Sequence, residues 1–201
     1  MATEDEQFLV PTETYLKSGI HIGTKFRTKY MEQFIYKTRP DGLNVLNLQK
    51  IDERIKIAAY FLSLYAPDDI IAVSRRESGW KGIKKFQEMT SIRVFAGRYP
   101  PGMLTNPALA IYSEAKIMLV SDAWPDRNAV LDALKIGIPV IALCDTNNQA
   151  NNIDLVVPCN NKGKKSLGLL FYILTREYLK GRRVIKSDDE FTVTIDDFTE
   201  A

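Results

Sequence analysis

The sequence predicts an α/β protein of the doubly wound kind, in which a mostly parallel sheet lies between two layers of helices. Apolar runs such as "DIIAVSR" (69–75) and "KIMLVSD" (116–122) lack polar alternation, which is typical of strands buried on both faces. Amphipathic helical segments alternate with these runs. The length of 201 residues suits one domain with a sizeable core. We therefore expect a three-layer α/β/α fold with flexible acidic termini.

The N-terminal third is expected to form two helices and a pair of strands. Thr12 is placed to cap the first helix and Gly19 to end it, while Pro67 closes the second. Apolar residues recur at helical spacing through the second helix. In chain order the expected elements are helix 11–19, strands 34–39 and 44–48 around the turn "PDG" (40–42), and helix 49–65.

The remainder is expected to consist of strand–helix units that build the parallel sheet. A loop rich in proline and glycine (99–107) interrupts the alternation, and Gly137 with Pro139 ends one helix. Such sheets bind ligands outside the carboxyl ends of their strands. The expected elements are strand 69–75, helix 79–89, strands 92–98 and 116–122, helix 127–137, strands 139–145 and 154–160, and helix 166–183.

Charge divides the chain into three parts: an acidic N-terminal segment (1–10), one α/β domain (11–186) and an acidic C-terminal tail (187–201). Residues 15–186 carry all 27 basic residues and only 15 of the 25 acidic ones, a formal charge of +12. A basic body of this kind favours a polyanionic partner. Residues 190–198 form an isolated strand, a mobile tail or a segment that orders on a partner.

Several classes of protein are disfavoured. No apolar run approaches the ~18 residues of a membrane span, and "MATEDEQ" lacks a signal-peptide pattern, so we expect a cytoplasmic protein without a membrane partner. Cys144 and Cys159 lie in apolar runs and are expected to be buried reduced thiols, with a redox pair as the alternative. Two cysteines and one histidine are too few for a structural zinc site.

The sequence does not match the two common nucleotide-binding motifs. No strand leads into G-x-G-x-x-G, and "PCNNKGKKS" (158–166) has Pro158 and Lys165 where a P-loop needs glycine and a hydroxyl. We therefore expect no cofactor and no small-molecule substrate. Basic residues at a helix N-terminus still suit an RNA phosphate.

Three carboxylates leave an enzymatic alternative open. Asp122, Asp126 and Asp145 follow strand ends, where clustered aspartates hold magnesium in some doubly wound domains. Thr146 would supply a hydroxyl, but a lysine for phosphotransfer is missing from the pattern. The other interpretation is that these aspartates cap helices or fix loops. A third possibility is a protein-interaction module that uses the acidic tails.

The single histidine stands in "SGIHIGTKFRTKY" (18–30). Catalysis needs a positioned partner, and no nearby serine, cysteine or aspartate pattern provides one. We expect Gly19, His21 and Gly23 to form a structural turn, with an RNA contact of His21 as the alternative. No catalytic residue and no metal ligand is predicted.

Six basic clusters, several of them interleaved with aromatic residues, predict an RNA-binding surface. For any one cluster, and for the helix 79–89 above all, a solvated charged face is the alternative. The candidate RNA-binding residues are Lys25, Arg27, Lys29, Lys37, Arg39, Arg75, Arg76, Lys81, Lys84, Lys85, Lys162, Lys164, Lys165, Arg182 and Arg183.

Two stretches resemble the family of the second protein of the small ribosomal subunit, across residues 8–183. They are "SGIHIGTKFRTKYMEQFIYKTRPDGLNVLNLQK" and "DALKIGIPVIALCDTNNQANNIDLVVPCNNKGKKSLGLLFYILTREYL". The chain has neither the helical insertion of the bacterial form nor the long acidic extension of the eukaryotic form, so it resembles an archaeal-type member. The resemblance implies a doubly wound sheet and a structural role near the head–body junction. It also implies contacts with small-subunit ribosomal RNA and neighbouring ribosomal proteins, without catalysis.

The chain departs from the family pattern around one strand–helix connection. Ala115 replaces a proline, Asp132 a glutamate, and Asp122-Ala123-Trp124-Pro125 stands where Asp-Pro is frequent. No RNA contact is therefore carried over from the family for residues 122–127.

Overall fold

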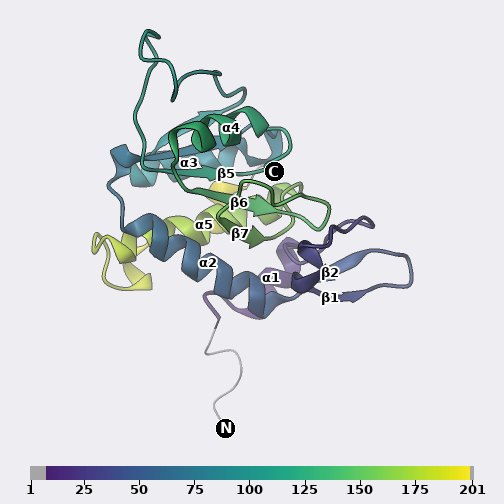
Figure 1. Cartoon of the computed structure of the whole chain (residues 1–201). Helices are drawn as coiled ribbons and strands as arrows, with labels where there is room; N and C mark the ends of the chain where they lie inside the picture. The colour runs from purple at the N-terminus through teal and green to yellow at the C-terminus, as the bar shows by residue number, and fades with distance from the viewer. Residues whose placement is uncertain (1–7, 200–201) are drawn as a thin grey trace.

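The computed structural model describes residues 8–199 and has the predicted three-layer α/β/α fold (Figure 1). Its central sheet is parallel throughout, in the order β4-β3-β5-β6-β7. The chain winds outward in one direction from β3 to β4 and in the other from β5 to β7, so the topological switch point lies between β3 and β5. The strands are β3 (Ile70–Ser74), β4 (Arg93–Ala96), β5 (Ile117–Val120), β6 (Val140–Cys144) and β7 (Leu155–Pro158).

Helices cover one face of the sheet more fully than the other. On the first face α5 (Lys164–Gly181) packs against both α2 (Leu48–Ser63) and α3 (Trp80–Thr90). The opposite face carries α4 (Arg127–Ile136), which lies above the sheet in Figure 1 while α2 and α5 lie below it. Between β4 and β5 the irregular segment 97–116 replaces a helix and contributes buried side chains to the core: Tyr99, Met103 and Leu104.

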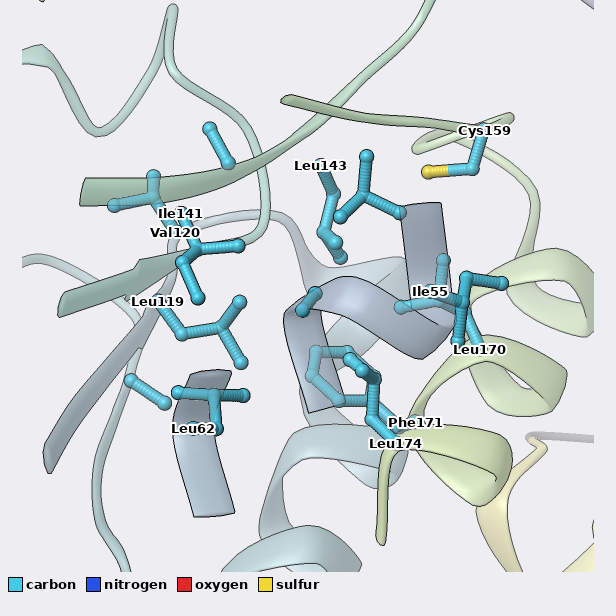
Figure 2. Packing of buried hydrophobic residues seen from close by; sticks show 14 of the residues in the cluster. Ile55, Leu62, Leu119, Val120, Ile141, Leu143, Cys159, Leu170, Phe171 and Leu174 are labelled. Atoms are coloured by element: carbon cyan, nitrogen blue, oxygen red, sulfur yellow. The ribbon is translucent and has the colours of Figure 1, made fainter. Parts of the chain in front are cut away.

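The core lies between the sheet and the α2–α5 layer (Figure 2). Ile55 of α2, Leu119 of β5, Ile141 of β6 and Phe171 of α5 are at most 1% exposed. Burial of such side chains contributes roughly 1.5–3 kcal/mol each. All five residues of β3 and of β6 are buried, as the unbroken apolar runs predicted. Within residues 8–199, no helix combines the length and the apolar character needed to cross a membrane.

Both cysteines are buried in this core and free. Cys159 N–H donates to the carbonyl of Cys144 on the neighbouring strand over 2.9 Å. Burial raises the pKa of both thiols, so the reactive thiolate form is disfavoured. The prediction of buried reduced thiols is confirmed.

The N-terminal elements form a separate layer beside the sheet. α1 (Thr12–Ser18) ends at Gly19, which has a φ of +69° as the predicted glycine stop requires. The expected capping role of Thr12 is wrong: Thr12 is already helical, and Pro11 occupies the N-cap position without a side-chain cap. The fully buried Tyr15 anchors this helix instead, its hydroxyl donating to Asp52 over 2.7 Å.

Strands β1 (Ile35–Thr38) and β2 (Asn44–Leu46) pair antiparallel as a two-stranded sheet of their own. Gly42 in the turn between them has a φ of +83°, a conformation that favours glycine. Figure 1 shows this hairpin projecting from the body of the molecule next to α1. Asn47 then caps α2 by accepting a hydrogen bond from the N–H of Gln49 over 2.9 Å.

Residues 188–198 form a 3-10 turn (Asp188–Glu190) and a short helix, α6 (Ile195–Phe198), rather than a strand. Their acidic residues Asp188, Glu190, Asp196 and Asp197 are exposed, whereas the aromatic residues Phe191 and Phe198 are buried. α6 packs on both α3 and α5. This part of the expected tail therefore shares the apolar interior of the domain.

Candidate nucleic-acid interface

The basic segment after α1 is joined to the hairpin by backbone hydrogen bonds. Gly23 N–H donates to the carbonyl of Asn44 over 2.9 Å. The side-chain amide of Asn44 in turn donates to the carbonyls of Thr24 (2.7 Å) and Lys25 (3.2 Å). Asn44 is only 1% exposed, so water does not compete for these bonds.

Thr146, in the loop after β6, is the second anchor of the segment. Its hydroxyl accepts a hydrogen bond from the N–H of Thr24 and donates to the carbonyl of Phe26, both over 2.9 Å. Its own carbonyl accepts from the N–H of Thr28 over 2.9 Å. Thr146 is fully buried. We call residues 23–30, held between Asn44 and Thr146, the fastened loop.

The fastened loop directs cations and aromatic rings toward solvent. Lys25, Arg27 and Lys29 are exposed, and so are Phe26 (80%) and Tyr30 (44%). Arg27 makes a half-exposed ion pair with Glu32, a contact weak enough for a phosphate to replace. Because the backbone is already ordered, binding through these side chains loses less conformational entropy than binding through a free segment.

Gly23 is required by this close packing. A Cβ at this position would lie 2.5 Å from the Thr146 methyl carbon and 2.9 Å from the Asn44 carbonyl oxygen. We expect Gly23→Ala to lower the free energy of unfolding by about 1–3 kcal/mol, as overpacking does, and to speed trypsin cleavage at Lys25, Arg27 and Lys29. Urea denaturation and timed digestion measure both effects. Unchanged digestion of Gly23→Ala would contradict the role given to this glycine.

His21 holds the preceding turn through its backbone. Its carbonyl accepts from the N–H of Leu46 over 2.8 Å. In the described part of the chain its buried Nδ1 has no hydrogen-bond partner, and burial lowers the pKa of the ring. The neutral ring lines a cavity of about 540 Å³ between α1 and the hairpin. This position fits the structural role predicted for His21 better than catalysis.

A buried polar network supports the loops at the carboxyl ends of the strands. The amide of Asn148 donates to Asp122 Oδ1 over 2.8 Å, and the amide of Asn161 donates to Asn148 Oδ1 over 3.1 Å. Asp122 also accepts from the N–H of Trp124 over 3.0 Å. All three polar side chains that form the network are at most 6% exposed. The network ties the loops after β5, β6 and β7 into one rigid edge.

The three strand-end aspartates do not gather around one ion. Asp122 pairs with Arg76, and Asp145 pairs with Lys162 over 2.8 Å. Asp126 accepts a hydrogen bond from the backbone N–H of Arg75, on the other side of the switch point, over 3.2 Å. Across residues 8–199 there is no group of three or more His, Cys, Asp or Glu side chains that could hold a metal ion. The aspartates thus act as loop-fixing residues, the alternative that the sequence left open.

The predicted RNA-binding residues fall into separate groups. Two groups adjoin the carboxyl ends of the strands: the fastened loop with the hairpin, and the loops that follow β3 and β7. A carbon added at Gly42 would lie 3.9 Å from the Lys25 side chain, so hairpin and loop form one surface. The candidates in these groups are Lys25, Arg27, Lys29, Lys37, Arg39, Arg75, Lys164 and Lys165, which we call the basic edge. Arg76 and Lys162 belong to the same loops but pair with the buried Asp122 and Asp145.

The remaining candidates lie elsewhere. Arg182 and Arg183 follow the far end of α5, about 27 Å from its first turn at 1.5 Å per residue. On α3, Lys81 donates to the carbonyls of Asp196 and Thr199, and Lys85 pairs with Glu88. Lys84 lies over the ring of Trp80, 6.0 Å from its centre. The lysines of α3 are thus engaged with their own chain, and the structure does not bring them to the basic edge.

Two further arginines reach the same side of the molecule and were not among the predicted residues. Arg98 follows β4 and Arg127 begins α4, and both are exposed. Their positions after a strand and at a helix start would have identified them, because such positions meet at one end of a parallel sheet. Trp124, 77% exposed, lines the same small cavity as Arg127 and was likewise missed.

Comparison with known proteins gives one consistent result. The family model described as "Ribosomal protein S2" matches residues 110–181. The small ribosomal subunit protein uS2 of Nanoarchaeum equitans is 48% identical over 190 residues, which cover 94% of each chain. Its counterpart in Picrophilus torridus is 47% identical over 194 residues, 96% of this chain and 97% of the relative. That of Saccharolobus solfataricus is 48% identical over 192 residues, 96% of this chain and 83% of the relative.

Proposed function

Because this chain belongs to the family of small ribosomal subunit protein uS2, we propose that it is a structural constituent of the small subunit that binds ribosomal RNA and neighbouring ribosomal proteins in the cytoplasm. Family membership makes it a ribosomal protein and a structural component rather than an enzyme. The relatives are archaeal, in agreement with the archaeal-type assignment. The proposal adds which surfaces make the contacts.

Ribosomal RNA is assigned to the basic edge. The observation that carries this assignment is the fastened loop, whose ordered backbone presents three cations and two aromatic rings to solvent. The first turn of α5 adds the exposed Lys165 at the positive end of an 18-residue helix. Phosphate oxygens suit both features, and bases exposed by unpaired RNA suit the rings.

Neighbouring proteins are assigned to the cavity of about 540 Å³ between α1 and the hairpin. Leu16, Ile22 and Tyr36 line it and are 52%, 40% and 69% exposed. Exposed apolar side chains gathered in one concavity favour a protein segment over RNA.

The assignment of RNA is tested by salt dependence. Each phosphate neutralised by a cation releases counterions, so affinity for small-subunit RNA should fall steeply between about 50 and 200 mM salt. The triple variant Lys25→Ala, Arg27→Ala, Lys29→Ala should bind more weakly, with the slope of log K against log salt reduced by about 1 for each phosphate that is no longer neutralised. Filter binding across a salt series measures both quantities.

The control removes the same charge elsewhere. Lys116, Lys135 and Lys186 are exposed and lie just before β5, in the last turn of α4 and after α5, away from the fastened loop, so their triple replacement by alanine should leave the slope close to that of the parent chain. Equal losses in both triple variants would mean that net charge, and not this surface, drives binding.

Sedimentation tests the ribosomal role itself. In a gradient, a tagged chain should comigrate with ribosomes and, after magnesium is lowered, with the small subunit. A chain that stays at the top in both conditions would overturn the ribosomal role.

A further inference from the structure

Two small cavities flank the loop between β5 and α4, at the switch-point end of the sheet. The first has a volume of about 200 Å³ and is bordered by Trp124 and Arg127 on one side and by Gln149, Asn151 and Asn152 on the other. The second, about 170 Å³, is bordered by Arg75, Arg98, Pro125 and Asp126. We call them the indole pocket and the arginine pocket. The same few residues, 123–128, form a wall of each, so the two pockets are neighbours.

The indole pocket has the composition of a base-binding site. Trp124 is 77% exposed, although its ring is the largest apolar side chain a protein can bury. Gln149, Asn151 and Asn152 also line the pocket, and their side-chain amides carry both the donors and the acceptors that the edge of a nucleobase requires. No acidic residue lines the pocket. An aromatic face with amides beside it is the arrangement by which proteins stack and read unpaired bases.

The size of the pocket points to one unit of a longer ligand. At about 200 Å³ it is smaller than the roughly 300–1,000 Å³ of sites that enclose whole drug-sized molecules. A single planar base suits a pocket of this size, provided that the rest of the RNA strand lies outside the pocket. A base inside an A-form helix could not enter, because it is stacked and paired, so the RNA must be unpaired there.

The arginine pocket has two exposed arginines and one buried carboxyl, Asp126, which accepts from the Arg75 N–H, so its cationic groups outnumber its acidic one. Arg75 and Arg98 are exposed and follow the ends of the adjacent parallel strands β3 and β4. Arg75 also donates from its guanidinium to the carbonyl of Pro125 over 3.3 Å, which holds it against the loop. Arginine binds phosphate through a planar, fixed set of donors.

We propose that the two pockets together bind an unpaired segment of RNA, with one base stacked on Trp124 and an adjoining phosphate at Arg75 and Arg98. This inference rests on the proposed function and makes it more specific. The loop that carries Trp124 is rigid, because Asp122 beneath it accepts hydrogen bonds from Asn148 and from the N–H of Trp124. The site is thus formed before RNA arrives.

Short ribonucleotides test the inference directly. Fluorescently labelled single-stranded hexamers of A, C, G or U are titrated against the full chain, and anisotropy reports binding. Trp124→Leu should weaken binding about 5-fold to 150-fold, the range expected for loss of one stacked base. Trp124→Phe should keep a part of the affinity because a ring remains. Asn151→Ala should change the preference among the four hexamers, and a duplex of the same length should show no dependence on Trp124.

The matched control is Tyr60→Leu, which removes an aromatic side chain of similar exposure (68%) from α2, outside both pockets. It should bind hexamers as the parent chain does. Hexamer binding that is equal in Trp124→Leu and the parent chain would overturn the inference. So would a photoreactive residue at position 124 that crosslinks to a protein, and not to RNA, in purified small subunits. Sedimentation of the parent chain tests the proposed function separately, since it does not depend on Trp124.

Discussion

Phe198→Ala should detach α6 from α3 and α5 and lower the free energy of unfolding by about 3 kcal/mol. This is the low end of the range for a buried phenylalanine, because the terminal segment can move away and so leave no closed cavity in the core. Phe198 is 1% exposed and its ring centre lies 5.8 Å from that of Tyr172. The backbone of Phe198 packs closely against α5, since a Cβ added at Gly168 would lie 3.0 Å from the Phe198 carbonyl oxygen. Urea denaturation measures the loss, and trypsin should cleave faster at Lys186.

The control for this prediction is Thr192→Ala, an exposed residue of the same segment that should have no effect. Unchanged stability of Phe198→Ala would mean that the segment is not docked in solution. The docking also bears on the hypothesis that the acidic tail binds a protein. Deletion of residues 187–201 would remove Phe198 as well, so the cleaner test replaces the exposed Asp196 by asparagine and keeps Asp197, which caps α6.

Asp126→Asn should stabilise the protein by about 3 kcal/mol at pH 7 and by very little near pH 4. Burial raises the pKa of Asp126 from 3.8 to about 6, and the charge of Asp122 adds to this, while the Arg75 N–H and the charges of Arg75 and Arg76 oppose it. One of its carboxylate oxygens, Oδ1, is buried without a hydrogen-bond partner among residues 8–199. The protein therefore holds an imperfectly compensated charge at neutral pH.

The sign of the pH dependence follows from linkage. Between pH 3.8 and about 6 the unfolded chain has already released the proton that folded Asp126 retains. The free energy of unfolding therefore falls as the pH rises through this window, by about 1.4 kcal/mol per pH unit, and the contribution of Asp126 is constant above it. The neutral side chain of Asp126→Asn removes this dependence. Urea denaturation at several pH values from 4 to 8 measures the difference between the two proteins.

Asp132→Asn is the matched control on the same helix. Asp132 is also buried, but it pairs with Lys135 over 3.3 Å and accepts from the N–H of Gly102 over 2.8 Å. Neutralising a compensated carboxylate should lower stability, the opposite sign to Asp126→Asn. A stability difference between Asp126→Asn and the parent chain that is independent of pH would contradict the account of Asp126.

The fold was predictable from sequence because its strongest signal is local. Continuous apolar runs identified the strands to within about two residues, and Gly19 and Gly137 ended their helices as predicted, each with positive φ. The error at Thr12 has a different origin. Local capping preference was outweighed by tertiary anchoring, since the buried Tyr15 and its bond to Asp52 position α1. The burial of Phe198 could not be predicted either, because its partners on α3 and α5 are distant in the chain.

The site was predictable in composition but not in arrangement. The cations and rings of residues 25–30 are visible in the sequence, whereas their attachment to Thr146 is not, because hydrogen-bond partners far apart in the chain leave no periodic pattern. For the same reason the ion pair of Asp145 with Lys162 was not foreseen. Trp124 lies where the chain departs from the family pattern, and its role depends on amides that arrive from another loop.

The attachment of Thr24 to Thr146 also sets an order on biosynthesis. These residues are 122 positions apart, and a chain emerges from its N-terminus as it is made. Lys25, Arg27 and Lys29 are therefore synthesised early, yet they acquire their fixed orientation only after β6 and the loop behind it have emerged. Until then these cations lie on a segment that Thr146 does not yet hold. The surface that we propose for RNA is therefore complete only once β6 and the loop that carries Thr146 have been made and folded.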